Sequence, residues 1–298
     1  MEIRFEMNEG IKTKFLSSLE NENERRSLAF EKWQGLGNDF IIVEGVKLAP
    51  ELVIKLCDRN FGIGADGIFC PAPAQKGGDI AWDFYNADGS TAQMCGNGMR
   101  CFAKYVFEKG LVKERKFSVE TLAGVVIPEI LSDEQGGKVR VDMGAPILEA
   151  AKIPVNIDTP QDFTVEGFSA TAVSMGNPHC VIFLEDDKGG NTRAQAVEKG
   201  IRIELSPIFP EKTNVEFAKV ISRSEIQVDV WERGCGITLA CGTGACASVV
   251  AGVLKGLLDS KVRVNLPGGA LEVEYAGADA NVYMTGDAKK VFEGVIEV

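Results

Sequence analysis

Two copies of a short turn containing cysteine and glycine, about half the chain apart, constrain the fold of this 298-residue sequence more than any other feature. The first copy reads CGNG at 95–98 and the second reads CGTG at 241–244. After each turn, apolar residues recur at helical spacing until a glycine, Gly110 or Gly256, which is typical of a helix end. We therefore predict two similar halves, each containing a helix that opens at one of these turns, near residues 97 and 243.

The rest of each half is predicted to consist mostly of strands. From Leu28 onward, β-rich runs such as LAFEKW, FIIVEG, GIFCPAPA and DIAWDFYN alternate with glycine turns, and a short helix is expected after Pro50. Turn-rich sequence between residues 136 and 154 offers a boundary. We expect an α/β (α+β) fold with an N-terminal half over 28–144 and a C-terminal half over 145–287.

Residues 1–27 are expected to form an extension before the fold proper. Apolar and polar residues alternate over 1–7, which predicts one short strand. The charge-dense segment 20–26 is more typical of a solvated helix face or linker than of a site.

Composition and charge exclude several classes of protein. With 45% hydrophobic and 25% charged residues the chain can fill a globular core, and no apolar run approaches the roughly 18 residues of a membrane span. A net charge of −11 repels phosphate backbones, so no nucleic-acid partner is expected. Eight cysteines are too few for a disulfide-stapled secreted domain, and the N-terminus lacks a signal-peptide pattern. We expect reduced thiols and a cytoplasmic protein.

The two cysteine turns suggest acid–base chemistry at a carbon bearing a carboxylate. A sulfur at a helix N-terminus faces unpaired N–H groups and the positive end of the helix dipole, so we expect lowered thiol pKa values at Cys95 and Cys241. The N–H groups of Gly96–Asn97 and Gly242–Thr243 can bind a carboxylate held between the turns. If both turns meet, one thiolate can remove the α-proton while the opposite thiol protonates the other face, which inverts the stereocentre.

The other six cysteines are expected to be small buried hydrophobic residues, namely Cys57, Cys70, Cys101, Cys180, Cys235 and Cys246. Three polar residues near the turns are candidate supporting groups. Asp88 precedes the first turn, although a simple Asp-Gly turn would also explain it, and Glu232 precedes the second turn beside Arg233, where a surface ion pair is the alternative. His179, the only histidine, follows a Gly-Asn-Pro turn and could tune a thiol near neutral pH.

Six motifs in order, from about residue 28 to the C-terminus, resemble diaminopimelate epimerases: GLGNDF (35–40), FGIGADG (61–67), YNADGS…MCGNGMRC (85–101), MGNPH (175–179), TNVEF (213–217) and ERG…ACGTGA (232–245). The resemblance implies two pseudo-symmetric halves, each a mostly antiparallel sheet wrapped around a central helix, with the final strand over 288–298 returning to the first half. It implies a homodimer that interconverts LL- and meso-diaminopimelate, on the route to lysine and cell-wall peptide, with no cofactor and no metal.

The resemblance also implies roles for individual residues. Cys95 and Cys241 match the catalytic pair, and Asp88, His179 and Glu232 match groups flanking the thiols and the substrate amine. The residues that match substrate-binding positions are Asn38, Asn86, Gly96, Asn97, Asn177, Asn214, Glu232, Arg233, Gly242 and Thr243. Two positions depart from the pattern: Ile237 stands where glutamate is common, and Asp287 stands where proline is common.

Two other functions are compatible with the same cysteines. One is racemisation of a different amino acid such as proline, against which Asn97 and Arg233 argue, because they suit a polar distal head. The other is a redox or binding protein with a switchable disulfide, which the absence of a CxxC motif disfavours.

Overall fold

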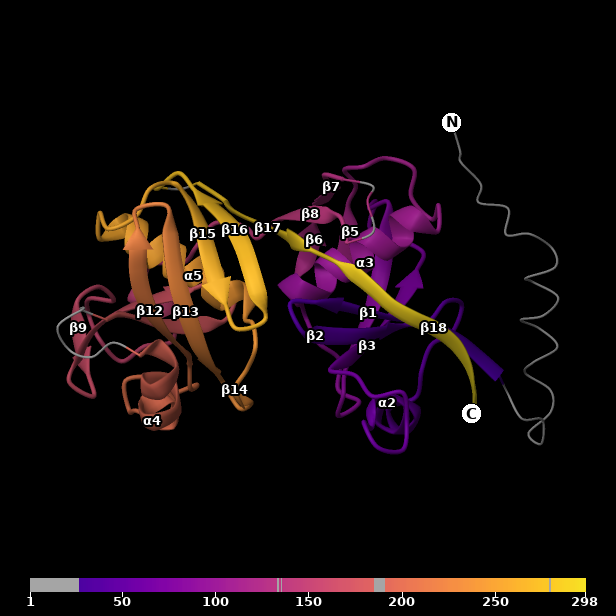
Figure 1. The fold of residues 1–298 in the computed structure, drawn as a ribbon, viewed down its shortest axis with the longest axis horizontal. Helices are drawn as coiled ribbons and strands as arrows, with labels where there is room; N and C mark the ends of the chain where they lie inside the picture. Colours follow the sequence, from indigo (N-terminus) through magenta and orange to yellow (C-terminus); the bar gives the residue numbers. More distant parts are fainter. Residues whose placement is uncertain (1–26, 133, 135, 185–190, 279) are drawn as a thin grey trace.

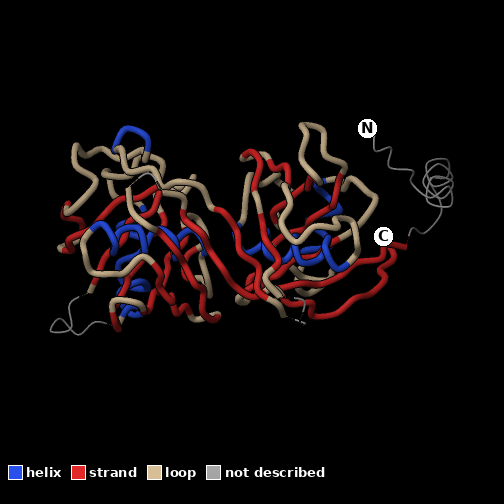
Figure 2. Tube along the Cα trace, turned by 90° about the horizontal axis from the view of Figure 1, so that it is seen from above, coloured by secondary structure: helices blue, strands red, loops and turns tan. Residues whose placement is uncertain are grey.

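The computed structural model describes residues 27–132, 134, 136–184, 191–278 and 280–298. Two lobes lie side by side, and each contains one helix surrounded by strands: α3 (Gly96–Glu108) in one lobe and α5 (Gly242–Leu254) in the other (Figure 1). The view from above shows the same arrangement (Figure 2). The predicted α+β fold with two similar halves is confirmed. The strand predicted over 1–7 and the charged segment 20–26 lie outside the described residues.

The first lobe is built on a seven-stranded sheet with the order β18-β1-β2-β3-β4-β5-β6. Its strands are β1 (Ser27–Gly35), β2 (Asn38–Ile42), β3 (Gly67–Ala72), β4 (Ile80–Asn86), β5 (Val119–Thr121), β6 (Gly124–Val126) and β18 (Lys289–Glu297). The predicted helix after Pro50 is α2 (Pro50–Cys57), between β2 and β3. The sheet packs on α3 through aromatic rings, because Trp82 stacks on Phe69 at 4.7 Å and meets Phe102 edge-on at 5.4 Å.

The second sheet has eleven strands, of which β14 pairs only with β13, and it extends from the second lobe into the first through β8 and β7 (Figure 1). Its strands are β7 (Pro128–Ile130), β8 (Lys138–Asp142), β9 (Phe163–Val165), β10 (Phe168–Ser174), β11 (Pro178–Phe183), β12 (Asn214–Ser222), β13 (Glu225–Glu232), β14 (Gly236–Ile237), β15 (Lys261–Leu266), β16 (Gly269–Tyr275) and β17 (Val282–Asp287). A short 3₁₀ helix covers Ala150–Lys152, and α4 (Thr192–Glu204) lies against β12 and β13.

The two lobes are joined through shared strands as well as through the chain. Strand β8 pairs with β17 of the second sheet, yet its Val139 and Val141 pack in the same core cluster as Phe102 of α3. Strand β18 continues from β17 and pairs antiparallel with β1 over Ser27–Gln34 (Figure 1). The chain after residue 287 therefore lies in the first lobe, and β17 runs between the two central helices. The division at residue 144 stays a prediction.

Both central helices begin and end as their sequences indicate. Each starts one residue before the expected position, with Cys95 or Cys241 as its N-cap residue. Gly110 and Gly256 follow the last turns with φ values of 67° and 68°, the left-handed conformation that glycine adopts without strain.

Helix α4 was not predicted from the sequence, because its 13 residues are charge-dense and only a narrow face is buried. Asn191 caps it, accepting a hydrogen bond from the Ala194 N–H at 2.9 Å. Gly200 lies flat against Trp231, where an added Cβ would come within 2.5 Å of the ring. This helix is therefore held by a close backbone approach to the sheet together with a narrow apolar face that includes Ala196 and Ile203.

Candidate active site

The N-termini of α3 and α5 carry the two cysteines of the repeated turn. The Cys95 sulfur accepts a hydrogen bond from the Gly98 N–H at 3.4 Å, and the Cys241 sulfur accepts one from the Gly244 N–H at 3.4 Å. Each thiol therefore replaces the hydroxyl or carboxylate that more often caps a helix. The arrangement leaves each sulfur at the positive end of a helix dipole.

These two helix ends meet. The Asn97 Nδ2 of α3 donates to the Ala240 carbonyl oxygen, just before α5, at 3.3 Å. Met284 of β17 lies between the helices: a Cβ on Gly96 would come within 2.9 Å of its Cε, and one on Gly242 within 3.1 Å of its Sδ. A Cβ at either glycine would require the Met284 side chain to shift. The repeated turns are thus brought to one place, as the two-base hypothesis requires.

The thiols themselves are less acidic than the sequence predicted. Burial raises the pKa of Cys95 to about 11 and that of Cys241 well above its ordinary value. The charge of Glu232 raises both thiol pKa values further, and that of Glu216 raises the pKa of Cys241. Hydrogen bonds from the helix N–H groups lower them, but by less. The expected lowering is therefore wrong for the protein without substrate, because desolvation of a thiolate outweighs the helix terminus.

His179 is paired with Glu216, a residue for which the sequence predicted no role. Its Nδ1 is 2.8 Å from Glu216 Oε1, and both side chains are fully buried. Its Nε2 is 3.0 Å from the Asn177 Oδ1. The same Glu216 oxygen lies close to the first turn of α5, within 2.6 Å of the position a Gly244 Cβ would take. Glu216 Oε2 has no hydrogen-bond partner among the described residues.

Two further groups link this pair to the α5 terminus. Asn177 Nδ2 donates to the Thr243 hydroxyl at 3.4 Å, and that hydroxyl is 3.4 Å from the Cys241 sulfur. Polar contacts thus run from Glu216 through His179, Asn177 and Thr243 to the thiol.

The end of β13, the turn that follows it and the start of β12 bring three predicted residues, Glu232, Arg233 and Asn214, to the same region. Thr238 donates to Glu232 Oε1 at 2.6 Å. The Arg233 N–H donates to Asn214 Oδ1 at 2.9 Å, and Asn214 Nδ2 donates to the Pro178 carbonyl oxygen at 2.9 Å. Because Pro178 directly precedes His179, Asn214 ties Arg233 to the histidine strand. The Arg233 side chain is exposed and donates only to the Glu211 carbonyl oxygen, at 3.3 Å, among its described partners.

The first lobe contributes Asn38, which lies beside Cys95. The Cys95 sulfur is 3.6 Å from Asn38 Oδ1, and Asn97 Nδ2 is 3.5 Å from the same oxygen. Asn97 Oδ1 is buried and has no partner among the described residues. An unpaired acceptor next to two helix N-termini is a position that a ligand donor can fill.

Asn86 and Asp88 belong to a turn of their own. Asn86 Nδ2 donates to the Ser90 hydroxyl at 2.9 Å, and that hydroxyl donates to Asp88 Oδ1 at 2.6 Å. Asp88 is exposed, and the hydrogen bonds from Ser90 lower its pKa. Its described contacts thus fit the Asp-Gly turn, and its acid–base role stays a prediction.

A family model described as diaminopimelate epimerase matches residues 30–149 and 171–291. The chain belongs to the diaminopimelate epimerase family. A relative named diaminopimelate epimerase, from Trichodesmium erythraeum, is 47% identical over 281 residues, which cover 90% of this chain and 99% of the relative. A chloroplastic diaminopimelate epimerase of Oryza sativa subsp. japonica is 46% identical over 93% of this chain and 82% of its own length.

Solved structures with much lower identity share the fold of this family member. A hydroxyproline epimerase from Agrobacterium vitis superposes with a TM-score of 0.66 at 17% identity, covering 92% of this chain and 94% of that one. A phenazine biosynthesis protein of the PhzF family from Bacillus anthracis gives 0.63 at 14% identity, covering 92% and 100%. These likenesses confirm the two-lobed architecture expected for a diaminopimelate epimerase.

Sequence reasoning missed Glu216 and the acidic and basic groups around Asn38, which are Asp39, Arg59 and Asp66. Glu216 stands two residues after Asn214 in a strand, so both side chains point to the same face, and that alternation was the available signal. One cysteine prediction is also wrong: Cys235 is exposed, because it lies in the turn between β13 and β14. The other five are buried as expected.

The two departures from the family pattern lie outside the thiol region. Ile237 pairs with Trp231 and packs at the edge of the core beneath α4. Asp287 contributes its carbonyl oxygen, which accepts from the buried Arg100 Nε at 3.3 Å. Within the described ranges, no three His, Cys, Asp or Glu side chains are grouped to hold a metal ion, and no helix there has the length and apolar character to cross a membrane.

Glu232 gives a testable dependence of stability on pH. Burial raises its pKa above the ordinary value, and the hydrogen bond from Thr238 only partly opposes this. As pH rises, the unfolded chain loses this proton first, so folded stability falls until the pH exceeds the folded pKa. We expect Glu232→Gln to have a higher melting temperature than the parent at pH 8, measured by thermal unfolding. At pH 4 its melting temperature should not exceed that of the parent. A gain that is the same at both pH values would show that the charge of Glu232 is not the cause.

Proposed function

We propose that this chain interconverts LL- and meso-2,6-diaminopimelate by a two-base mechanism in which Cys95 and Cys241 are the acid and the base. The meeting of the two cysteine-capped helix ends carries the proposal. Membership of the diaminopimelate epimerase family supports the choice of substrate.

The first step requires one thiolate and one thiol on opposite faces of the α-carbon. The thiolate removes the α-proton and becomes a thiol, while the electron pair of the broken C–H bond spreads into the substrate carboxylate. The opposite thiol gives its proton to the other face and becomes the thiolate. The stereocentre is inverted, and the reverse reaction uses the same groups with exchanged roles.

The helix N-termini supply the main stabilisation of this transition state. The N–H groups of Gly96–Asn97 and Gly242–Thr243 face the place where the reacting carboxylate would lie, and two dipoles add there. Preformed donors stabilise charge that develops during reaction, usually the largest electrostatic effect in such a site. No cofactor is needed in this scheme.

The remaining residues fit the rest of the substrate. We assign Arg233, with Asn214 and Asn86, to the distal amino-acid head, where a guanidinium can bind a carboxylate through two parallel hydrogen bonds. Asn38, Asn177, His179 and Glu232 surround the thiols and the reacting amine.

Hydrogen exchange during turnover tests the proposal. In deuterated solvent, LL-diaminopimelate should be converted to the meso form with one deuterium gained at the inverted carbon, followed by mass spectrometry. L-proline should not be turned over. Conversion of L-proline with no conversion of diaminopimelate would contradict the substrate, and equal activity after oxidation of the thiols to a disulfide would contradict the mechanism.

We propose that the protein is a homodimer that pairs through β18. This strand is the edge of the first sheet, and its Val291, Phe292 and Val295 are exposed at 55%, 46% and 68%. Exposed apolar side chains on a long edge strand are normally covered in native proteins. Sedimentation of the parent should give a dimer, whereas Val291→Lys combined with Val295→Lys should give a folded monomer. A parent that sediments as a monomer would contradict the pairing.

The mechanism also indicates a compartment. Both sulfurs have to stay reduced, so we propose that the protein works in the cytoplasm, where thiols are kept free. The eight cysteines are free in the structure.

A further inference from the structure

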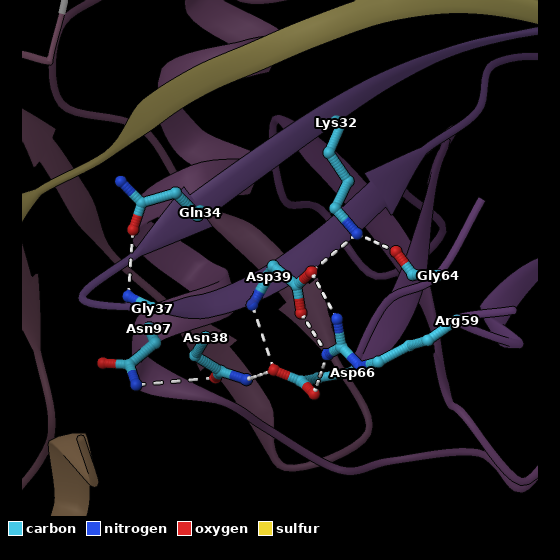
Figure 3. A network of polar contacts seen from close by, with 9 residues as sticks. All are labelled: Lys32, Gln34, Gly37, Asn38, Asp39, Arg59, Gly64, Asp66 and Asn97. Carbon is cyan, nitrogen blue, oxygen red and sulfur yellow. Dashed lines mark hydrogen bonds and ion pairs between the residues drawn. The ribbon is translucent and has the colours of Figure 1, made fainter. Parts of the chain in front are cut away.

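The side-chain amide of Asn38 is held in one orientation by a carboxylate. Asp66 Oδ2 accepts from Asn38 Nδ2 at 2.7 Å and from the Asp39 N–H at 3.1 Å (Figure 3). A carboxylate oxygen only accepts, so the amide has to turn its amino group toward Asp66. The carbonyl oxygen of Asn38 therefore points the other way, to the Cys95 sulfur at 3.6 Å and the Asn97 amide at 3.5 Å.

Asp66 is in turn fixed by a network of ion pairs. Arg59 Nη2 lies 2.7 Å from both Asp66 Oδ1 and Asp39 Oδ1, and its Nη1 donates to Asp39 Oδ2 at 3.1 Å (Figure 3). Lys32 lies 2.7 Å from Asp39 and also donates to the Gly64 carbonyl oxygen. The planar guanidinium thus spans two carboxylates through Asp66 Oδ1 and leaves Asp66 Oδ2 to accept from Asn38 and from the Asp39 N–H.

This network of ion pairs is exposed to solvent and contributes little to the stability of the fold. The side chains of Arg59 and Asp66 are 57% and 42% exposed, and ion pairs this accessible to solvent add little to stability. Their geometry is nevertheless well defined, because four hydrogen bonds converge on Asp66 and Asp39 from one arginine and one amide. The network is better suited to orienting a side chain than to holding the fold.

We propose that Asp66 is a positioning residue, which together with Arg59 keeps the Asn38 carbonyl oxygen directed at the Cys95 sulfur. A carbonyl beside a thiol accepts a hydrogen bond from the S–H group and disfavours the thiolate. The Cys241 sulfur has different neighbours, the Thr243 hydroxyl and the Gly244 N–H, and both can donate. The two thiols thus have the same helix cap but different side-chain partners, so the Asn38 carbonyl favours the protonated form at Cys95 and has no counterpart at Cys241.

The test measures the thiols directly and needs no substrate. In Asp66→Asn, residue 66 can present a carbonyl as well as an amino group, so the Asn38 amide can turn its N–H toward sulfur. A hydrogen bond gained by the thiolate should increase the population of this charged form about tenfold. We expect iodoacetamide to alkylate Cys95 about tenfold faster at pH 7.5 in this variant, with Cys241 unchanged, each followed by peptide mass spectrometry. Epimerisation should fall, an effect that rests on the proposed function.

Three further variants make the result specific. Asp79→Asn is the control, because Asp79 is also an exposed carboxylate that accepts from an N–H and a hydroxyl, those of Ser118. In this variant Cys95 should be alkylated at the same rate as in the parent. Arg59→Met leaves Asp66 and Asn38 in place and should also increase the rate of Cys95 alkylation. This variant tests the proposal if Asp66→Asn does not fold. In an Asn38→Ala background, Asp66→Asn should add nothing further.

Three results would overturn the proposal. They are an unchanged Cys95 rate in Asp66→Asn, equal acceleration of both cysteines, and a full effect of Asp66→Asn without Asn38. Alkylation does not depend on diaminopimelate, so these results test the role of Asp66 separately from the proposed reaction. The proposed reaction is tested by the epimerisation assay of the parent protein.

Discussion

Cys95→Ala and Cys241→Ala should each lose epimerisation of diaminopimelate by at least about 10²–10⁴-fold, the range that a positioned acid or base supplies. Either variant lacks one proton carrier on one face of the α-carbon, and neither neighbouring helix can replace it. Initial rates of LL-to-meso conversion measure the loss. Both variants should stay folded, because alanine fits where the sulfur was and only a weak helix cap is removed.

Cysteines deeper in the same two helices provide matched controls. Cys101 lies on α3 and Cys246 on α5, and both are fully buried among apolar side chains. Cys101→Ala and Cys246→Ala should retain epimerase activity near that of the parent. Activity near normal in Cys95→Ala or Cys241→Ala would remove that residue from the acid–base pair.

Glu216→Ala should destabilise the fold by about 3 kcal/mol, because it leaves a fully buried histidine without its partner. For a chain of this size that corresponds to a fall in melting temperature of about 5 °C, measured by thermal unfolding. The variant also removes a charge that raises the pKa of Cys241, so any activity that survives should reach its maximum at a lower pH.

Glu216→Gln separates the two effects. Glutamine keeps the volume and the hydrogen bond to His179 but removes the charge, so the melting temperature should fall by less than half as much as in Glu216→Ala. Equal melting temperatures for the two variants would show that the contact with His179 does not stabilise the fold.

Much of this protein was determined locally, by short stretches of sequence. The cysteine-capped starts of α3 and α5 and their glycine ends at Gly110 and Gly256 were predicted to within one residue, because capping and left-handed glycine depend on neighbours in the chain. The strands β1 to β4 followed from β-rich runs between turns. Helix α4 escaped prediction because the contact of Gly200 with Trp231 joins distant segments.

The sequence predicted most residues of the candidate site but not the direction in which the thiol pKa values are shifted. The sequence alone determined that two thiols stand at two helix N-termini, since each turn contains its own cysteine and glycines. Only the tertiary structure decided that burial raises both thiol pKa values, that Glu216 pairs with His179, and that Asp66 accepts a hydrogen bond from Asn38. Desolvation and carboxylate charge act through space between residues far apart in the chain, so no local pattern records them.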